Sequence, residues 1–302
     1  MNIVQKTIGA IDAFQRRHRP TAFMHAVIKK YSDDQAGYQA ALVTYYGFLS
    51  LFPLLLILTT VAGIIGHNNP EFGHDLVESV SRYFPVFAQA LDDSVRGFGK
   101  NGLALAIGLL FALYGARGIA DAFRHAVNHI WHVPLAKRSG FPRSLLRSAG
   151  LIFGGGGGFI AAALLAGWTA SAGRGWSSAI VSVLVNLGIL YAVFMLIFRM
   201  SLPLSLPRRK FRLSAVICAI GIAVLQMVGV IVLTRESEHL ATTYSALFAT
   251  TLGLMAWIYL QIQVVIYSVE IATVKDSKLW PRSLSGQNLT EADHLLQKRR
   301  EV

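Results

Sequence analysis

The chain has 302 residues, of which 54% are hydrophobic and only 15% are charged, and its mean hydropathy is +0.49. Because soluble domains carry about 25% charged residues, this composition excludes an ordinary soluble enzyme, a disordered chain and a collagen-like repeat. The net charge of +12 is typical either of a soluble nucleic-acid-binding protein or of a membrane protein whose basic residues set its orientation.

The first 35 residues predict helices that lie on a membrane surface. Apolar residues recur at helical spacing over 3–14 and again over 23–31, with basic residues between them. Residues 1–20 contain five charged residues and no apolar stretch, so we expect no secretory signal peptide. We therefore expect residues 1–35 to form interfacial amphipathic helices, and the first span to drive insertion into the membrane.

Six long, mostly apolar stretches follow, and each is long enough for the roughly 20 residues that a transmembrane helix needs. The sequence therefore predicts an all-α polytopic membrane protein. In it, 36–274 form one membrane domain and 275–302 form a cytoplasmic tail. The expected spans lie at about 40–66, 102–123, 149–172, 176–198, 213–234 and 243–271.

The segment at 70–100, between the first two spans, is amphipathic and acidic. Its apolar residues recur at helical spacing among Asp and Glu residues, and Pro85 divides it. We expect one or two helices that lie over the extracytoplasmic mouth of the helix bundle. The pattern leaves open whether they form a gate, a docking face or an inert connection.

The basic residues sort by side of the membrane. With the six predicted spans, 23 Lys and Arg residues lie on the side of the two termini and five lie on the opposite side. The positive-inside rule then places both termini in the cytoplasm, and anionic lipid headgroups are expected contacts of these residues. Aromatic side chains do not accompany the basic residues as a base-stacking platform, so nucleic acid is not an expected partner.

Motifs in three of the spans carry a resemblance to a known family. The first span contains YYGFLSLFPLL at 45–55, the second contains RGIADAF at 117–123 and NHIW at 128–131, and the last contains TYS at 243–245 and VEIA at 269–272. Together these motifs resemble the YihY/BrkB family, the virulence factor BrkB group, over about residues 25–275. Two glycines common in that family are Ser245 and Ser268 here.

The resemblance implies six helices, cytoplasmic termini and a location in the bacterial inner membrane. Some members of the family carry an older ribonuclease BN label. Others are associated with serum resistance or with envelope lipid traffic.

Ionisable side chains inside the predicted spans are the first functional candidates. Arg117, Asp121 and Asn128 share one face of a helix with Arg124. A charge at the bilayer centre costs about 3 kcal/mol on insertion scales, so such residues usually face the bundle interior or a wet cavity. The face is either the polar wall of a substrate pathway, where Arg117 binds a phosphate or carboxylate, or a helix end that reaches the cytoplasmic interface.

Glu270 is the only acidic residue in the last predicted span. We expect it at the depth of Arg117, where a contact between the two would satisfy two costly charges at once. Such a contact is either a structural clamp, which we favour, or a switch that opens during transport.

Tyr45, Tyr46 and Ser50 are the polar side chains that a cavity beside the first span would use. Pro53 removes a backbone hydrogen bond and kinks that span, and kinked helices occur both at transport sites and as packing features. The glycine run at 154–158 lacks the Lys-Ser/Thr of a phosphate loop. We therefore expect Gly154 and Gly158 to bring two helices close together, with a flexible hinge as the alternative.

The residues predict no cofactor and no metal site. The single cysteine, Cys218, excludes an internal disulfide and a cysteine-based zinc cluster. One acidic residue and three histidines share a side of one helix, but four ligands along about 16 Å of a helix cannot surround one ion. These residues are Asp121, His125, His129 and His132.

Together these features favour a transporter or flippase-like protein for an anionic or amphiphilic envelope lipid, with membrane lipids as partners. The alternative is a non-transporting membrane scaffold for envelope integrity or serum resistance, with segment 70–100 as the docking face for envelope-assembly partners. We expect no enzyme, because RNA hydrolysis needs a carboxylate cluster or a histidine pair in an aqueous site. No acidic residue lies between Lys137 and Arg212, in the predicted cytoplasmic loops.

Overall fold

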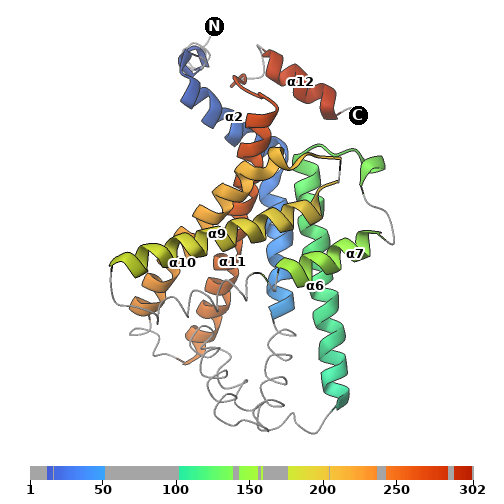
Figure 1. The fold of residues 1–302 in the computed structure, drawn as a ribbon, viewed down its shortest axis with the longest axis vertical. Coiled ribbons are helices and arrows are strands. Elements are labelled where there is room, and N and C mark those ends of the chain that lie inside the picture. The colour runs from blue at the N-terminus through green and yellow to red at the C-terminus, as the bar shows by residue number, and fades with distance from the viewer. Residues whose placement is uncertain are drawn as a thin grey trace. The chain divides into compact units, whose positions relative to one another are not determined.

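The computed structural model describes nine stretches of the chain: 12–15, 17–51, 102–138, 143–155, 158, 176–203, 205–236, 243–284 and 289–300. All regular secondary structure in these stretches is helical (Figure 1), which confirms the predicted all-α class. Three described helical segments are long and apolar enough to cross a membrane: Ile180–Ser201, Arg208–Val228 and Thr251–Asp276. Segment 70–100 and Pro53 lie outside the described residues.

Four long helices cover four of the predicted spans: α6 (Gly102–Ile130), α9 (Trp176–Ser201), α10 (Arg212–Glu236) and α11 (Thr243–Asp276). The predicted spans at 40–66 and 149–172 are described in part. The first is represented by a helix at 36–51, and the second by α7 (Arg143–Gly150) and the π-helical turn η4 (Leu151–Gly155). The remaining elements are α2 (Arg19–Asp33), η3 (Leu135–Lys137), η5 (Arg208–Phe211) and α12 (Glu291–Arg300).

The chain divides into two compact units, which we call unit 1 and unit 2. Unit 1 comprises Met1–Ala40, Phe123–Gly229 and Gln261–Val302, and unit 2 comprises Ala41–Ala122 and Val230–Leu260. Each boundary falls inside a helix, so the helix at 36–51, α6, α10 and α11 contribute residues to both units.

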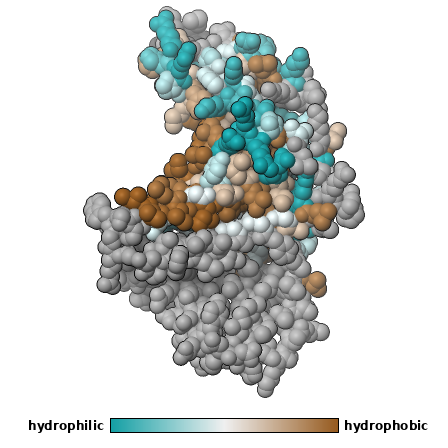
Figure 2. All heavy atoms as spheres, viewed as in Figure 1, coloured by the Kyte–Doolittle hydropathy of each residue, from teal (hydrophilic) through white to brown (hydrophobic). Residues whose placement is uncertain are grey.

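The long helices of unit 1 expose apolar side chains. Ile180, Leu184 and Leu196 are exposed on α9, and Ile220 and Met227 on α10. Figure 2 shows hydrophobic side chains gathered over α9, whereas hydrophilic ones gather over α2 and α12. An apolar patch of this extent is unfavourable in water, and it is the exterior that lipid-facing helices carry. The apolar face therefore indicates a membrane protein.

A tight turn ends α2 and sets the position of two charged residues. The N–H of Asp34 donates to the Lys30 carbonyl at 2.9 Å. Gln35, with φ of 51°, adopts the left-handed conformation in which a helix commonly ends. The chain then enters the helix at 36–51. This geometry places the Lys30 and Asp34 side chains, four residues apart, in contact with each other.

Glycines allow α9 to lie close to the chain around η4. A Cβ at Gly154 would come within 2.9 Å of Leu196 Cδ2, and a Cβ at Gly158 within 2.6 Å of Val193 Cγ2. Real Cβ atoms essentially never approach other atoms so closely. Both glycines that the sequence singled out for helix contact thus lie against α9 in unit 1.

In unit 2, α6 and the helix at 36–51 touch at two further glycines. A Cβ at Gly115 would lie 2.9 Å from Ser50 Cβ and 3.1 Å from Ser50 Cα, and a Cβ at Gly118 would lie 2.4 Å from the Tyr46 ring. Because a backbone atom such as Ser50 Cα cannot swing aside, Gly115 is the more constrained of the two. Tyr46 and Ser50 therefore lie in a helix–helix contact.

We predict that Gly115→Ala lowers the free energy of unfolding by about 1–3 kcal/mol, the usual cost of overpacking a tight contact. Unfolding of the full chain in detergent micelles measures this. The matched control is Gly188→Ala on α9, where nothing lies within 4 Å of the added Cβ. There alanine is expected to stabilise the helix by about 0.5–1 kcal/mol. Equal effects at the two positions would contradict the close approach at Gly115.

Candidate functional site

Lys30, Asp34 and Glu270 form a buried ion cluster in unit 1. The Lys30 ammonium bonds to Asp34 Oδ2, donates to Glu270 Oε2 at 2.8 Å, and donates to the Ile130 carbonyl at 3.0 Å. These contacts use all three of its N–H donors. The side chains of Lys30, Asp34 and Glu270 are 0%, 1% and 0% exposed. One ammonium therefore joins α2, the end of α6 and α11.

The ion cluster is costly to assemble and costly to break. Removing an ion from water carries a penalty of several kcal/mol, which is recovered only when its partners are well placed. The second oxygen of Glu270, Oε1, is buried and has no hydrogen-bond partner among the described residues. The Lys30 ammonium is thus the group that stabilises the Glu270 carboxylate in this part of the chain.

The partner of Glu270 differs from the one that the sequence suggested. We expected a contact with Arg117, but Glu270 bonds to Lys30, and Arg117 bonds to Asp121 with Nε and Oδ2 3.4 Å apart. The expectation failed because charge and predicted depth do not distinguish one cation from another. The sequence pattern assigns Lys30 only to the basic residues that set orientation.

A sequence signal for Lys30 exists, although it is weak. Ala22, Ala26 and Lys30 recur every four residues and lie on the buried face of α2. A lysine at that period among small apolar residues is expected to point inward, where a carboxylate must meet it. The spacing predicts that Lys30 has a buried carboxylate partner but does not identify that residue.

Aromatic side chains join α2 to α11 beside the ion cluster. The Tyr31 hydroxyl donates to Gln263 Oε1 at 2.7 Å. The rings of Tyr31 and Tyr267 stack with centroids 4.3 Å apart and planes at 6°. The two helices therefore meet over more than one turn.

Asn128 acts as a structural link between helices. Its Nδ2 donates to the Arg124 carbonyl at 2.6 Å and to the Ser201 carbonyl at 2.9 Å, which joins α6 to the end of α9. Arg124 Nη1 donates to the Ser144 carbonyl at 2.9 Å and to Ser148 Oγ at 3.1 Å, which joins α6 to α7. These two residues of the predicted polar face are occupied in helix contacts.

Arg117 and Asp121, the other two members of that face, lie in unit 2 and are accessible. Their side chains are 57% and 47% exposed. An exposed pair four residues apart on a helix is worth about 0.3–0.5 kcal/mol. The Arg117 guanidinium is therefore held weakly and remains available to an anion.

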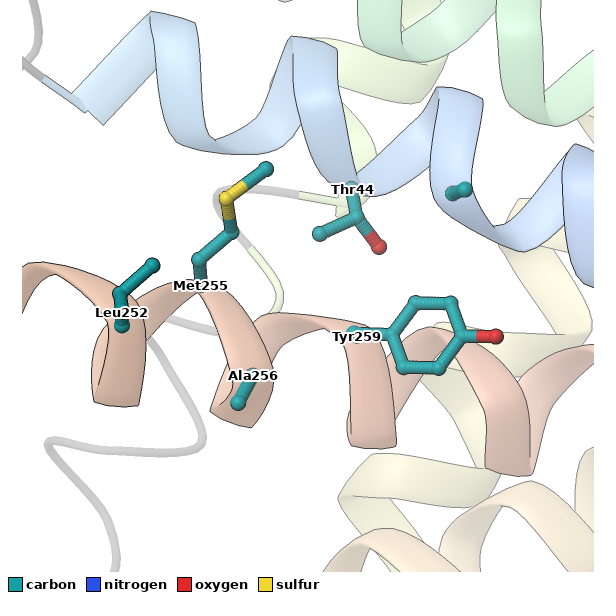
Figure 3. Close-up of a pocket in the computed structure, with 6 residues that line it drawn as sticks. Thr44, Leu252, Met255, Ala256 and Tyr259 are labelled. Atoms are coloured by element: carbon teal, nitrogen blue, oxygen red, sulfur yellow. The ribbon is translucent and has the colours of Figure 1, made fainter.

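An apolar groove lies between the helix at 36–51 and α11 in unit 2 (Figure 3). Its volume is about 290 Å³, and its lining residues are Ala41, Thr44, Leu252, Met255, Ala256 and Tyr259. Among the described lining residues, Thr44 and Tyr259 carry the side-chain hydroxyls. Of the residues predicted to serve a cavity, Tyr45 is 51% exposed, and Tyr46 and Ser50 lie against α6.

The described residues give no metal centre. His125 and His129 stack along α6 with ring centroids 6.4 Å apart, and the His132 ring lies 6.5 Å from that of His129. Among the residues that the structure describes, no group of three or more His, Cys, Asp or Glu side chains is placed to hold a metal ion.

The C-terminal segment is bound to the N-terminal helices of unit 1 by a second network. Buried Arg282 donates to Asp293 Oδ1 at 2.9 Å and to Asp33 Oδ2 at 2.8 Å, and its carbonyl accepts from Gln15 Nε2 at 2.7 Å. An apolar cluster of α2, the end of α11 and α12 lies beside it: Ala26, Val27, Val274, Leu279 and Leu296. The predicted tail is therefore a docked part of unit 1.

We predict that Lys30→Met lowers the free energy of unfolding by about 3–5 kcal/mol, because it leaves two buried carboxylates without their cation. The matched control is Lys210→Met. Lys210 pairs with Asp276 at 2.9 Å, but these side chains are 38% and 29% exposed, so the loss should stay below about 1 kcal/mol. Denaturant unfolding in detergent micelles measures both variants. Equal losses would rule out a special role for the ion cluster.

We predict that acid weakens the docking of α12. Burial by itself would raise the pKa of Asp293, but hydrogen bonds from the Ser283 N–H, from the N–H and hydroxyl of Thr290 and from Arg282 hold that pKa well below its ordinary value of 3.8. A carboxyl whose pKa is depressed on folding stabilises the fold fully above its unfolded pKa, and this contribution is lost as the pH falls toward the folded pKa.

Hydrogen exchange of the α12 amides, corrected for the intrinsic exchange rate, measures this docking. Protection should be constant above pH 3.8 and should decline below it. In Asp293→Asn, lowering the pH below 3.8 should reduce the protection of the α12 amides less than it does in the unmodified chain. An identical pH dependence in the variant and the unmodified chain would assign it to other carboxyls.

Comparisons with known proteins identify the family of the chain. The sequence model named virulence factor BrkB matches residues 27–287. The chain is similar to the ribonuclease-like protein YfkH of Bacillus subtilis, with 26% identity over 269 residues, 83% of this chain and 94% of that protein. It is also similar to an uncharacterized protein of Dickeya dadantii, with 26% identity over 102 residues, 33% of this chain and 31% of that protein. No solved structure matches. Because the family match extends over most of the chain, from within α2 through the four long helices and all members of the ion cluster, the chain belongs to the virulence factor BrkB family.

Proposed function

We propose that this protein moves an anionic or amphiphilic envelope lipid across the bacterial inner membrane, with both termini in the cytoplasm. The observation that carries the proposal is the apolar groove of unit 2, which opens at the surface of a protein whose long helices are apolar outside. Transport is the proposed activity rather than catalysis, and membrane lipids are the proposed partners.

The lining of the groove favours a hydrocarbon chain. Four of its six lining residues carry only aliphatic or thioether side chains. Methionine adapts its shape to irregular ligands, and Met255 reaches toward the facing helix (Figure 3). Ligand sites are typically apolar with a few polar groups that fix orientation. Here the Thr44 and Tyr259 hydroxyls are those groups.

Arg117 supplies the charge that an anionic headgroup requires. It lies on α6, which contacts the helix at 36–51 through Gly115 and Gly118. That same helix forms one wall of the groove. Because the Arg117–Asp121 pair is exposed and weak, a phosphate can replace the Asp121 carboxylate. A guanidinium binds phosphate with two parallel hydrogen bonds.

We predict that vesicles containing the purified full chain move a labelled anionic lipid between leaflets faster than protein-free vesicles. Arg117→Gln should slow that movement by about tenfold, the effect of losing one charge-assisted hydrogen bond in the transition state. Arg209→Gln, at an exposed arginine of η5, is the matched control and should leave the rate unchanged. A wild-type rate equal to that of protein-free vesicles would falsify the proposal.

The second candidate function is a non-transporting scaffold, and the buried ion cluster is the observation that favours it. A cluster whose ammonium has no spare donor is suited to holding helices in one arrangement. Deleting segment 70–100 separates the two functions. A scaffold loses its envelope phenotype while lipid movement stays unchanged, whereas a transporter's phenotype follows its transport rate.

A further inference from the structure

Three basic side chains come together where α6 ends in unit 1. His125 and His129 lie four residues apart with nearly parallel rings, at 9°. Arg138 follows η3, and its Nη1 lies 3.5 Å from His125 Nδ1. The Nε of Arg138 donates to the Val133 carbonyl at 3.1 Å, which holds the guanidinium beside the imidazoles. We call His125, His129 and Arg138 the cationic cluster.

Positive charge in the cationic cluster is poorly compensated. Asp121, four residues before His125 on α6, is bonded to Arg117, and the sequence contains no further Asp or Glu from there until Glu236. Burial lowers the pKa of His125, and the charges of Arg138 and His129 lower it further. An imidazole that gains a proton there therefore meets two cationic neighbours, and an anion would relieve that repulsion.

The cationic cluster is also accessible. His125 is exposed, and His129 and Arg138 are partly exposed. This distinguishes it from the Lys30 ammonium, which is buried and fully bonded, and from Arg124, whose guanidinium bonds to α7. The side chains of the cluster can therefore reach a ligand from outside the unit.

We propose that His125, His129 and Arg138 bind a phosphate group. A planar guanidinium matches the oxygens of a phosphate, and each imidazole adds an N–H donor. The site consists of residues of unit 1 and shares none with Arg117 or the apolar groove. It is thus a second anion site, independent of the proposed transport.

The position of the cationic cluster favours a phospholipid headgroup as the source of the phosphate. His125 lies two residues beyond the predicted span at 102–123, where the polar headgroups of a bilayer begin. The positive-inside rule predicts that this end faces the cytoplasmic leaflet, which is rich in anionic lipid. Free inorganic phosphate has the same chemistry, so the experiment includes both.

The test uses the full chain in uncharged detergent micelles. Native mass spectrometry measures the binding of phosphatidylglycerol, and calorimetric titration measures the binding of inorganic phosphate. Arg138→Gln and the double variant His125→Gln/His129→Gln should each weaken binding by about tenfold, as expected for a lost charge-assisted hydrogen bond. Arg138→Lys keeps the charge but loses the planar guanidinium, so it should weaken binding less than Arg138→Gln does, and Arg209→Gln should change nothing.

Each outcome decides the proposal. Loss of phosphatidylglycerol binding alone supports a lipid headgroup, and loss of inorganic phosphate binding as well supports a free-phosphate site. Binding that is the same in all variants overturns the proposal. The proposal is also overturned if the two histidines are required for zinc binding while the variants bind phosphatidylglycerol and inorganic phosphate as the unmodified chain does. Thermal unfolding of each variant distinguishes a loss of binding from a loss of fold. Because His125 is exposed and His129 is partly exposed, the double-histidine variant should unfold at the wild-type temperature.

Discussion

The Lys30 ammonium is the contact on which the arrangement of unit 1 depends. This one ammonium stabilises three groups that would otherwise lack a partner or a counter-charge. The last residues of a helix leave carbonyls without partners, and Lys30 satisfies the carbonyl of Ile130, the final residue of α6. A carboxylate at a helix C-terminus is unfavourable, and Lys30 pairs with Asp34, which caps α2. The same ammonium pairs with Glu270 inside α11.

The surroundings of the ion cluster explain how such a costly feature is tolerated. The helix α2, which carries Lys30, also packs Ala26 and Val27 against Val274, Leu279 and Leu296, and the Arg282 network binds the C-terminal segment to the N-terminal helices. Hydrophilic side chains gather over α2 and α12, whereas α9 is covered by hydrophobic ones (Figure 2). Charge and apolar surface are therefore separated within unit 1, as a bilayer requires of a protein that spans it.

The accessible and buried ion pairs differ in what they can do. Arg117 and Asp121 are half-exposed and weakly coupled, so a ligand can replace either partner at a small cost. Lys30 has no free donor, and separating it from its partners would leave charges buried and unpaired. An exposed cation that exchanges its partner and a buried one that does not are the two kinds of ion pair that the proposed binding of anionic headgroups would require.

The sequence by itself determined the helical class, the positions of four long helices to within seven residues at each end, and the family. Runs of apolar residues and their charged flanks are local properties, and local properties decide where a helix begins and ends. The glycines at Gly154 and Gly158 were also recognisable as contact positions, because spacing along one helix face is local. The predicted bounds of α6 fell short by seven residues, since its final turns are polar and resemble an interface.

Only the tertiary structure decided which charges meet. Lys30 and Glu270 are 240 residues apart in sequence. The residues next to each of them in the sequence do not indicate that the two side chains form an ion pair. The sequence predicts Arg117 as the partner of Glu270, and charge and predicted depth do not single out Lys30, which the structure places there. The same applies to the groove, whose walls are ordinary apolar helix faces that become a site only when the helix at 36–51 and α11 leave space between them. Pairing and cavity shape depend on how helices pack, and packing is a property of the whole fold.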